Sequence, residues 1–241
     1  MAYFDYKRRA TSQVNIGGVP LGADNPIRVQ SMTSTSTDDI EASVAQSQRI
    51  ADAGADYVRL TAQGVKEALN IGRIREIMRA NGYRTPLVAD IHFNPKAAFA
   101  AAEVTDKVRI NPGNFVDSGI ATLEKQAEKN FEEGKEKVVE AFTPFVREAR
   151  ERGRVIRIGV NHGSLSARML YRYGDTVEGM VESAMEYLAV CEAEHFDQVV
   201  VSLKSSTPRV AIAAYRMLAA RLEKEHFKPY RRRNIRGKEN S

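Results

Sequence analysis

Hydrophobic and polar residues alternate along six short segments of the chain, and helical patterns fill most of the stretches between them. Alternation with a period of two is the pattern of a β-strand. The predicted strands span residues 26–31, 56–61, 86–91, 106–111, 155–160 and 198–204. Strands that alternate with helices favour parallel pairing and right-handed crossovers. The pattern therefore predicts an α/β protein whose strand–helix units form a TIM-barrel-like parallel barrel.

Capping residues mark where several of the helices begin. Asp38, with Glu41 three residues later, forms a capping box ahead of a helix that Gly54 ends. Asn94 and Thr207 each precede a proline, which is favoured at the first position of a helix. The long connection at 112–154 holds one predicted helix, EKVVEAFTPFVREARERG, preceded by the charged stretch EKQAEKNFEEGKEK.

The number of strand–helix units falls short of a complete barrel. A TIM barrel needs eight units, and the pattern supplies about six, with no sequence for two more after Arg221. We expect residues 1–226 to form a partial barrel and residues 227–241 a basic, disordered tail. Two open sheet edges favour association, and we include a homodimer among the expected partners.

Charge is concentrated in that tail. The 36 basic and 31 acidic residues fall to 30 of each when the 14 residues from Lys228 onward, which hold six basic residues and one acid, are set aside. A neutral body argues against a nucleic-acid surface on the folded part. An RNA-binding arm remains an alternative interpretation of the tail, although a solvated end or a truncated terminus is favoured.

Other classes of protein lack support in the sequence. No run approaches the roughly 18 apolar residues of a membrane span, and the first residues, MAYFDYKRRATSQ, lack the apolar stretch of a secretory signal, so we expect a cytoplasmic protein. Cys191 is the one cysteine, which excludes an internal disulfide and an all-cysteine metal site, and its helical stripe favours core packing. The sequence also lacks the glycine-rich motifs of nucleotide-binding loops and the His and Cys motifs of zinc sites.

Basic residues follow the same face of four predicted strands. Arg59, Arg109, Arg157 and Lys204 alternate with apolar neighbours, so each points away from the apolar face of its strand. If the strands are parallel, these cations converge inside the C-terminal mouth, where barrel enzymes place their chemistry. Several cations in one partly dry cavity repel one another and lose hydration, and an acidic ligand relieves both costs. The pattern predicts an anion site.

Polar residues near the strand ends are further candidates. Asp90 is suited either to a ligand hydroxyl or to pairing with an internal arginine, and His92 is more often a packed histidine than a functional one. The Pro-Gly pair in INPGN, at 110–114, frees the backbone to approach a ligand closely. GVNHGSLS, at 159–166, contributes amide, imidazole and hydroxyl groups, whereas Gln30 and Thr33 are candidates to line the mouth.

Six ordered motifs together resemble one known family. PIRVQSMTSTSTDD, ADYVRLTAQG, PLVADIHFNP, KVRINPGN, IRIGVNHGSLS and VVSLKSS look like the N-terminal part of the GcpE (IspG) family of 4-hydroxy-3-methylbut-2-enyl diphosphate synthases, over residues 8–222. The resemblance implies a barrel like that of dihydropteroate synthase. The long segment before IRIGVNHGSLS is similar to the three-domain branch found in plants and some bacteria, including Bacteroidetes, and the lack of a transit peptide favours a bacterial source.

The resemblance also implies a ligand and a set of roles. The family binds 2-C-methyl-D-erythritol 2,4-cyclodiphosphate, a cyclic diphosphate of the non-mevalonate isoprenoid pathway, and takes electrons from flavodoxin or ferredoxin. By the resemblance, Arg59, Arg109, Arg157 and Lys204 are diphosphate-binding cations. Polar groups that would line the same cavity are Asp90, Asn161, His162 and Ser202.

The chain departs from the family in one respect that matters for activity. The family reaction is a reductive ring opening at a 4Fe–4S cluster held by three cysteines and a glutamate of a C-terminal domain, and those cysteines do not exist here. We therefore expect no cluster, no metal ligand and no catalytic residue in this chain, and no turnover by it alone. The alternative is a stand-alone binding or transferase barrel of the dihydropteroate-synthase kind, which predicts activity without iron.

Overall fold

The computed structural model describes residues 9–116 and 127–225, with side chains of the second range described from residue 131. Six parallel strands form one curved sheet in the order β3-β4-β5-β6-β7-β8, and two more form an antiparallel hairpin. The strands of the described residues are β1 (Gln13–Ile16), β2 (Val19–Gly22), β3 (Gln30–Met32), β4 (Tyr57–Ala62), β5 (Leu87–Ile91), β6 (Lys107–Ile110), β7 (Val155–Asn161) and β8 (Val199–Lys204). The predicted parallel α/β architecture is confirmed.

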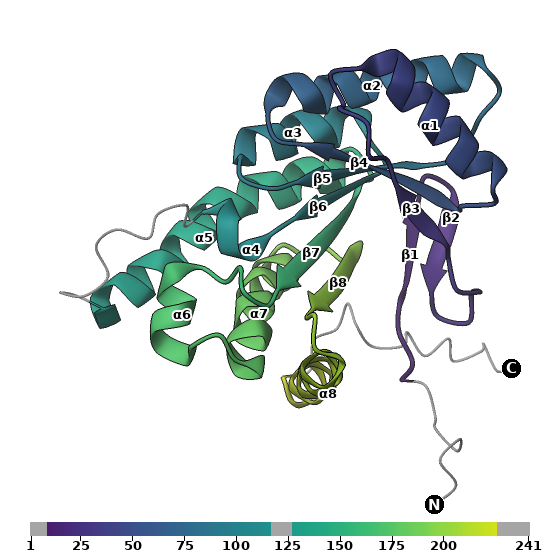
Figure 1. Ribbon diagram of the computed structural model, residues 1–241. Coiled ribbons are helices and arrows are strands. Elements are labelled where there is room, and N and C mark those ends of the chain that lie inside the picture. Colours follow the sequence, from purple (N-terminus) through teal and green to yellow (C-terminus); the bar gives the residue numbers. More distant parts are fainter. Residues whose placement is uncertain (1–8, 117–126, 226–241) are drawn as a thin grey trace, which may run out of the picture.

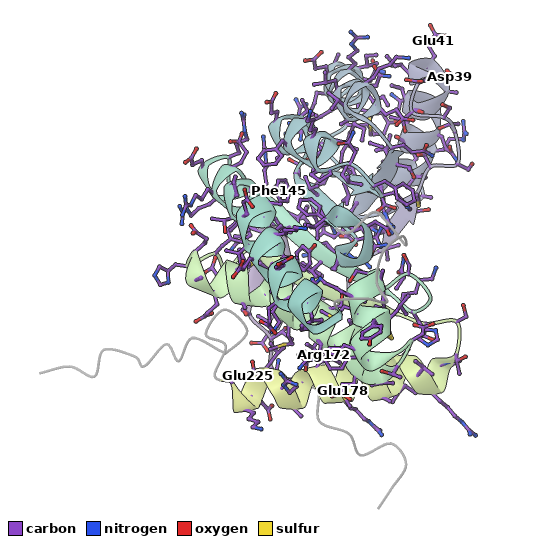
Figure 2. All side chains as sticks on the ribbon, turned by 90° about the vertical axis from the view of Figure 1, so that its left-hand side faces the viewer. Asp39, Glu41, Phe145, Arg172, Glu178 and Glu225 are labelled. Carbon is purple, nitrogen blue, oxygen red and sulfur yellow. The ribbon has the colours of Figure 1, made fainter. Side chains whose placement is uncertain are left out.

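Helices cover the outer face of this sheet, as Figure 1 shows. They are α1 (Ile40–Asp52), α2 (Val65–Ala80), α3 (Pro95–Val104), α4 (Pro112–Phe115), α5 (Ala127–Glu151), α6 (Ala167–Tyr173), α7 (Val177–Ala193) and α8 (Pro208–Lys224). Apolar residues of the strands, such as Leu60 and Ile158, pack against this layer in the main core. Phe145 of α5, labelled in Figure 2, is fully buried there. Burial of one strand face by helices leaves the other face to line the concave side.

The N-terminal hairpin was not predicted from the sequence. Gly17 and Gly18 have positive φ angles of 56° and 92°, which suits the two-residue turn between β1 and β2. Val14 and Ile16 of β1 pack against Tyr57, Val88 and Val155 in a second, smaller core on the inner face of the sheet. The hairpin therefore closes the N-terminal end of the concave side, below the predicted anion site.

Two other boundaries differ from the prediction. β3 begins at Gln30 rather than at residue 26, because the chain before it lies outside the ladder, where the side chain of Arg28 donates to the carbonyl of Pro20 at 2.8 Å. α5 begins at Ala127, so it includes most of the charged stretch that we expected to precede the helix. The expected helices after Asp38, Asn94 and Thr207 are present, although Asp39 caps the first of them.

The sheet does not close into a barrel within the described residues. β3 pairs with β4 alone and β8 with β7 alone, so both keep an open edge. Figure 2 shows the corresponding helices far apart, with Asp39 at the start of α1 and Glu225 at the end of α8. The expected tail at 227–241 lies outside the described residues. Among the helices that the structure describes, we find none with the length and apolar character needed to cross a bilayer.

Candidate functional site

The inward-facing residues of the sheet lie in layers that the strand register defines. In one layer Arg59 of β4, Val88 of β5 and Lys107 of β6 are aligned across neighbouring strands. The next layer toward the carboxyl ends aligns Asp90 of β5 with Arg109 of β6 and Arg157 of β7. Because successive inward positions on a strand are about 6.6 Å apart, these residues form one compact polar cluster on the concave face.

Asp90 is the centre of this cluster. Its side chain is 1 % exposed, and one carboxylate oxygen accepts from Arg109 Nη1 at 3.0 Å while the other accepts from Arg59. His92 Nε2 lies 3.1 Å from the same oxygen that Arg59 contacts. Burial alone would raise the pKa of Asp90, but the hydrogen bond with His92 and the charges of Arg59 and Arg109 hold it well below its ordinary range. The structure thus gives Asp90 the arginine-pairing role that was one of two alternatives.

Arg109 is the most enclosed of the predicted cations. Its side chain is 5 % exposed and donates from Nη2 to the carbonyl of Gly159 at 2.8 Å, in addition to its bond with Asp90. Gly159 is required here, since a Cβ at this position would lie 2.4 Å from Arg109 Nε. The glycine of β7 therefore makes the space in which the guanidinium group of β6 lies.

Positive charge exceeds negative charge in this cluster. Arg157 donates from Nε to Ser202 Oγ at 3.0 Å, and no carboxylate lies within ion-pair distance of it among the described residues. Burial lowers the pKa of Arg157, and the charges of Arg59 and Arg109 lower it further. The pKa of Arg109 is lowered mainly by burial, against the opposing effect of Asp90. The cations therefore repel one another, as the sequence pattern predicted.

The remaining predicted cation lies nearer the mouth. Lys204 of β8 aligns with Asn161 of β7, whereas Ser202 aligns with Gly159 one layer below. Lys204 is exposed, two layers beyond Arg157 and about 13 Å along the strand direction. The four cations thus form a ladder from the interior to the mouth rather than a ring at one height, because their strands place them at different register positions.

His162 and the INPGN turn are engaged by the chain itself. His162 follows β7 and lies beside Asp175, with Nε2 3.2 Å from its carbonyl oxygen and Nδ1 3.6 Å from its carboxylate. Gly113 approaches the backbone of Ser164 so closely that an added Cβ would lie 1.9 Å from the Ser164 carbonyl oxygen. Asn111 Nδ2 donates to Ser164 Oγ at 3.0 Å. The close approach that we expected for a ligand is made here by the loop after β7.

Gln30 does not line the mouth, and that expectation is wrong. It is aligned with Tyr57, one layer below Arg59, because β3 begins at this residue. There it accepts a hydrogen bond from Lys107 Nζ at 3.1 Å. Thr33 follows β3 and is buried, and its Oγ1 has no hydrogen-bond partner among the described residues. The Nε of Arg59 is likewise buried without a partner in this part of the chain.

Lys107 is the residue of this cluster that the sequence analysis missed. It precedes Arg109 by two residues and therefore shares its face of β6, which is the signal that could have identified it. Lys107 is 3 % exposed, which is unusual for a lysine. The concave face thus holds a fifth cation, in the same layer as Arg59 and one layer below Arg109 and Arg157.

The residues of this chain do not fit an iron–sulfur cluster. Such clusters take several cysteine thiolates, and Cys191 is the one cysteine of the sequence. It is fully buried in α7, and burial raises the pKa of its thiol well above the ordinary range. Among the described residues, no group of three or more His, Cys, Asp and Glu side chains is placed to hold a metal ion.

Fold and site together define a class of protein: a parallel α/β barrel portion with a cluster of cations on its concave face. A family model described as the GcpE TIM-barrel domain matches residues 11–227. The chain therefore belongs to the GcpE family, and the resemblance inferred from its motifs is confirmed.

Curated relatives carry the same family name. The chain is 55% identical over 227 residues to 4-hydroxy-3-methylbut-2-en-1-yl diphosphate synthase (flavodoxin) of Bacteroides thetaiotaomicron, which covers 93% of this chain and 37% of that protein. It is 57% identical over 222 residues to the synthase of the same name from Porphyromonas gingivalis, with 91% and 38% covered. The chain thus spans little more than a third of the length of these relatives.

Among solved structures, a truncated 3-deoxy-D-arabino-heptulosonate 7-phosphate synthase from Thermotoga maritima is similar in fold. The TM-score is 0.50 at 12% sequence identity, and the match covers 87% of this chain and 66% of that one. A likeness at this identity supports the α/β barrel architecture alone.

Proposed function

We propose that this chain is the substrate-binding barrel portion of a 4-hydroxy-3-methylbut-2-enyl diphosphate synthase and binds 2-C-methyl-D-erythritol 2,4-cyclodiphosphate. The observation that carries the proposal is the surplus of cations around Asp90: this carboxylate pairs with Arg59 and Arg109 and leaves the nearby Arg157 without an ion-pair partner among the described residues. Arginine presents several donors in a plane that matches phosphate oxygens, and its charge persists at neutral pH. The names of the relatives support the choice of a diphosphate.

The layers of the site suggest how the ligand lies. Arg157 and Arg109 would contact one phosphate group, and Lys204 with Asn161, two layers nearer the mouth, would contact the other end of the ligand. Buried donors without partners, the Nε of Arg59 and the hydroxyl of Thr33, are groups that a ligand oxygen or a bound water would satisfy. Ser202 holds Arg157 in place through its hydrogen bond.

The reduction itself would need groups that this sequence lacks. The 4Fe–4S cluster of the family requires thiolates beyond Cys191, so we assign binding and orientation of the ligand to these residues and no redox step. Flavodoxin, which the names of the relatives include, is the proposed electron donor of the whole enzyme, with ferredoxin as the alternative. The family match favours this function over a stand-alone transferase of the dihydropteroate-synthase kind.

Calorimetric titration of the chain with the cyclodiphosphate tests the proposal. Charge-assisted hydrogen bonds are worth roughly 1.5–3 kcal/mol each, so we expect Lys204→Ala and Arg157→Met to weaken binding by about ten- to a hundredfold. Lys66→Ala removes an exposed lysine from α2 and is the matched control, for which we expect no change. Equal affinity in the wild type and in both site variants, each shown to be folded, would refute the proposed site.

A further inference from the structure

Lys107 lies at the lowest level of the cationic cluster. Strand register aligns it with Val88 and Val155, which belong to the small core above the N-terminal hairpin. Its Nζ reaches across the concave face toward β3 and β4, where it donates to Gln30 and lies 4.8 Å from the centre of the Tyr57 ring. The ammonium group therefore lies at the boundary between this small apolar core and the predicted anion site.

In the part of the chain that the structure describes, no negative charge compensates this buried ammonium. Among the described residues, no carboxylate lies within 4 Å of Lys107 Nζ, and its contacts are a neutral amide and an aromatic face. The carboxylate of this face, Asp90, is already shared by Arg59, Arg109 and His92. An amide oxygen and a ring replace only part of the hydration that an ammonium ion loses on burial.

The surrounding charges reduce the proton affinity of Lys107 further. Burial is the main reason that its pKa falls to about 7, and the positive charges of Arg157 and Arg59 act in the same direction. Arg109, on the same strand and face, adds a further cation to this side of the sheet. At neutral pH the amine is therefore divided between its charged and neutral forms.

We propose that Lys107 is a positioning residue at the floor of the anion site, whose amine takes up a proton when a diphosphate or similar dianion binds above it. This inference rests on the proposed function for the identity of the ligand, but the chemistry requires only an anion in the cluster. The arriving negative charge offsets the repulsion from Arg59 and Arg157, and the charged form of Lys107 then stabilises the bound anion through the low-dielectric interior.

The direction of the pH dependence follows from this coupling. Protonation favours the anion-bound state, so the amine has a higher pKa with ligand than without it. Affinity for the anion is then constant below the pKa of the Lys107 amine in the free protein, about 7. Above that pH the affinity falls by about tenfold per pH unit, until the pH reaches the pKa of the same amine in the complex. Each phosphate of the cyclodiphosphate has one ionisable group, which is strongly acidic and has lost its proton near neutral pH. The ligand itself therefore stays a dianion over the whole pH range of the experiment.

Lysine-selective NMR observes the amine directly. In protein labelled with ¹³C at lysine Cε, the resonance that is missing from Lys107→Met belongs to Lys107. We expect its titration midpoint near pH 7 in the free chain and at least one pH unit higher with saturating cyclodiphosphate or with sulfate, a dianion of unrelated origin. A midpoint that neither anion raises overturns the inference.

Calorimetry in buffers of different ionisation enthalpy measures the accompanying proton uptake. Lys107→Met preserves chain length without charge, and we expect it to bind the cyclodiphosphate about tenfold more weakly at pH 6, with no decline in affinity between pH 7 and 8. His92→Gln removes the imidazole beside Asp90 and should retain the decline. Proton uptake that persists in Lys107→Met and disappears in His92→Gln assigns the coupling to His92 and contradicts the inference.

The outcomes separate this inference from the proposed function. If sulfate raises the midpoint of Lys107 while the cyclodiphosphate neither binds nor shifts it, the role of Lys107 stands and the proposed substrate is wrong. If the wild type binds the cyclodiphosphate and Arg157→Met binds it more weakly, but the titration midpoint of Lys107 stays unchanged, the proposed function stands and the proposed role of Lys107 is wrong. Lys66→Met, on the surface of α2, serves as the charge-loss control in both measurements.

Discussion

Asp90 determines how the arginines of the concave face are arranged. Its two oxygens engage β4 through Arg59 and β6 through Arg109, so one carboxylate connects three neighbouring strands. Arg109 would otherwise be a buried charge with a single carbonyl partner. The same carboxylate offsets only part of the local positive charge, which leaves the site attractive to an anion.

Removal of this carboxylate should be strongly destabilising. Loss of one partner from a buried ion pair leaves an uncompensated charge and costs about 3–5 kcal/mol, so we expect Asp90→Asn to lower the free energy of unfolding by about that amount at pH 7. Glu132→Gln breaks an exposed pair with Lys135 and should change it by less than about 0.5 kcal/mol. Urea denaturation measures both variants, and equal stability of Asp90→Asn and wild type would contradict this role.

The pH dependence of stability provides a second measure of Asp90. Its pKa in the folded chain lies below the ordinary value, so its contribution is present above about pH 4 and is lost as the pH falls toward the folded pKa. We expect the stability of the wild type to decline below pH 4 more steeply than that of Asp90→Asn. Parallel declines in the two proteins would show that other carboxylates govern acid unfolding.

Alternation along a strand was sufficient to predict which cations face inward, since a period of two determines the face of each residue. Arg59, Arg109 and Arg157 all lie on the concave side as expected. Pairing of Asp90 with an internal arginine was one of two predicted alternatives, but the particular partners could not be predicted, because Asp90 and Arg109 meet across 19 residues and Arg157 and Ser202 across 45. Lys107 was missed for a related reason: a buried lysine without a carboxylate contradicts the usual expectation that lysine is exposed.

At the level of elements, the long and regular units were predictable and the short ones were not. Alternating strands and capped helices carry their pattern locally, so β4 to β8 agree with the expected positions within a few residues. The β1–β2 hairpin has a Gly-Gly turn, a recognised hairpin signal that we did not use. α4 has four residues, too few to show a periodic pattern, although Asn111 caps it ahead of Pro112 as Asn94 caps α3.

Gly113 of α4 packs closely against the loop after β7, and a substitution can test how much this contact stabilises the fold. A Cβ on Gly113 must displace the backbone at Ser164, and overpacking of this kind costs about 1–3 kcal/mol. We expect Gly113→Ala to lower the free energy of unfolding by that amount. We also expect it to weaken cyclodiphosphate binding, because Asn161, a proposed ligand contact, is the last residue of β7 and leads directly into the loop that contains Ser164. Asn114→Ala, one residue further along α4, is the control. Full stability in Gly113→Ala would show that the loop moves aside freely.

At the scale of the whole molecule, the curved sheet has an open edge at each end within residues 9–116 and 127–225. A cavity of about 260 Å³ lies at the β8 edge between the hairpin and α8, lined in part by Val14, Leu21 and Leu222. Another, of about 300 Å³, lies at the β3 edge beside α1. The chain spans little more than a third of the length of the relatives that it matches.

The chain alone should therefore bind the cyclodiphosphate without reducing it. A 4Fe–4S cluster requires several thiolates, and Cys191, buried in α7 with its thiol pKa raised, lies in the helix layer away from the cations of the concave face. Anaerobic reconstitution with iron and sulfide, followed by absorbance spectroscopy and a turnover assay with a strong one-electron reductant, should give neither a stoichiometric cluster nor product. Cys191→Ser is the matched control, since any adventitious iron bound through this thiol would be lost in it. Product formation by the wild-type chain would refute the division of labour proposed here, whereas turnover restored by a separately expressed cysteine-bearing portion of a relative would support it directly.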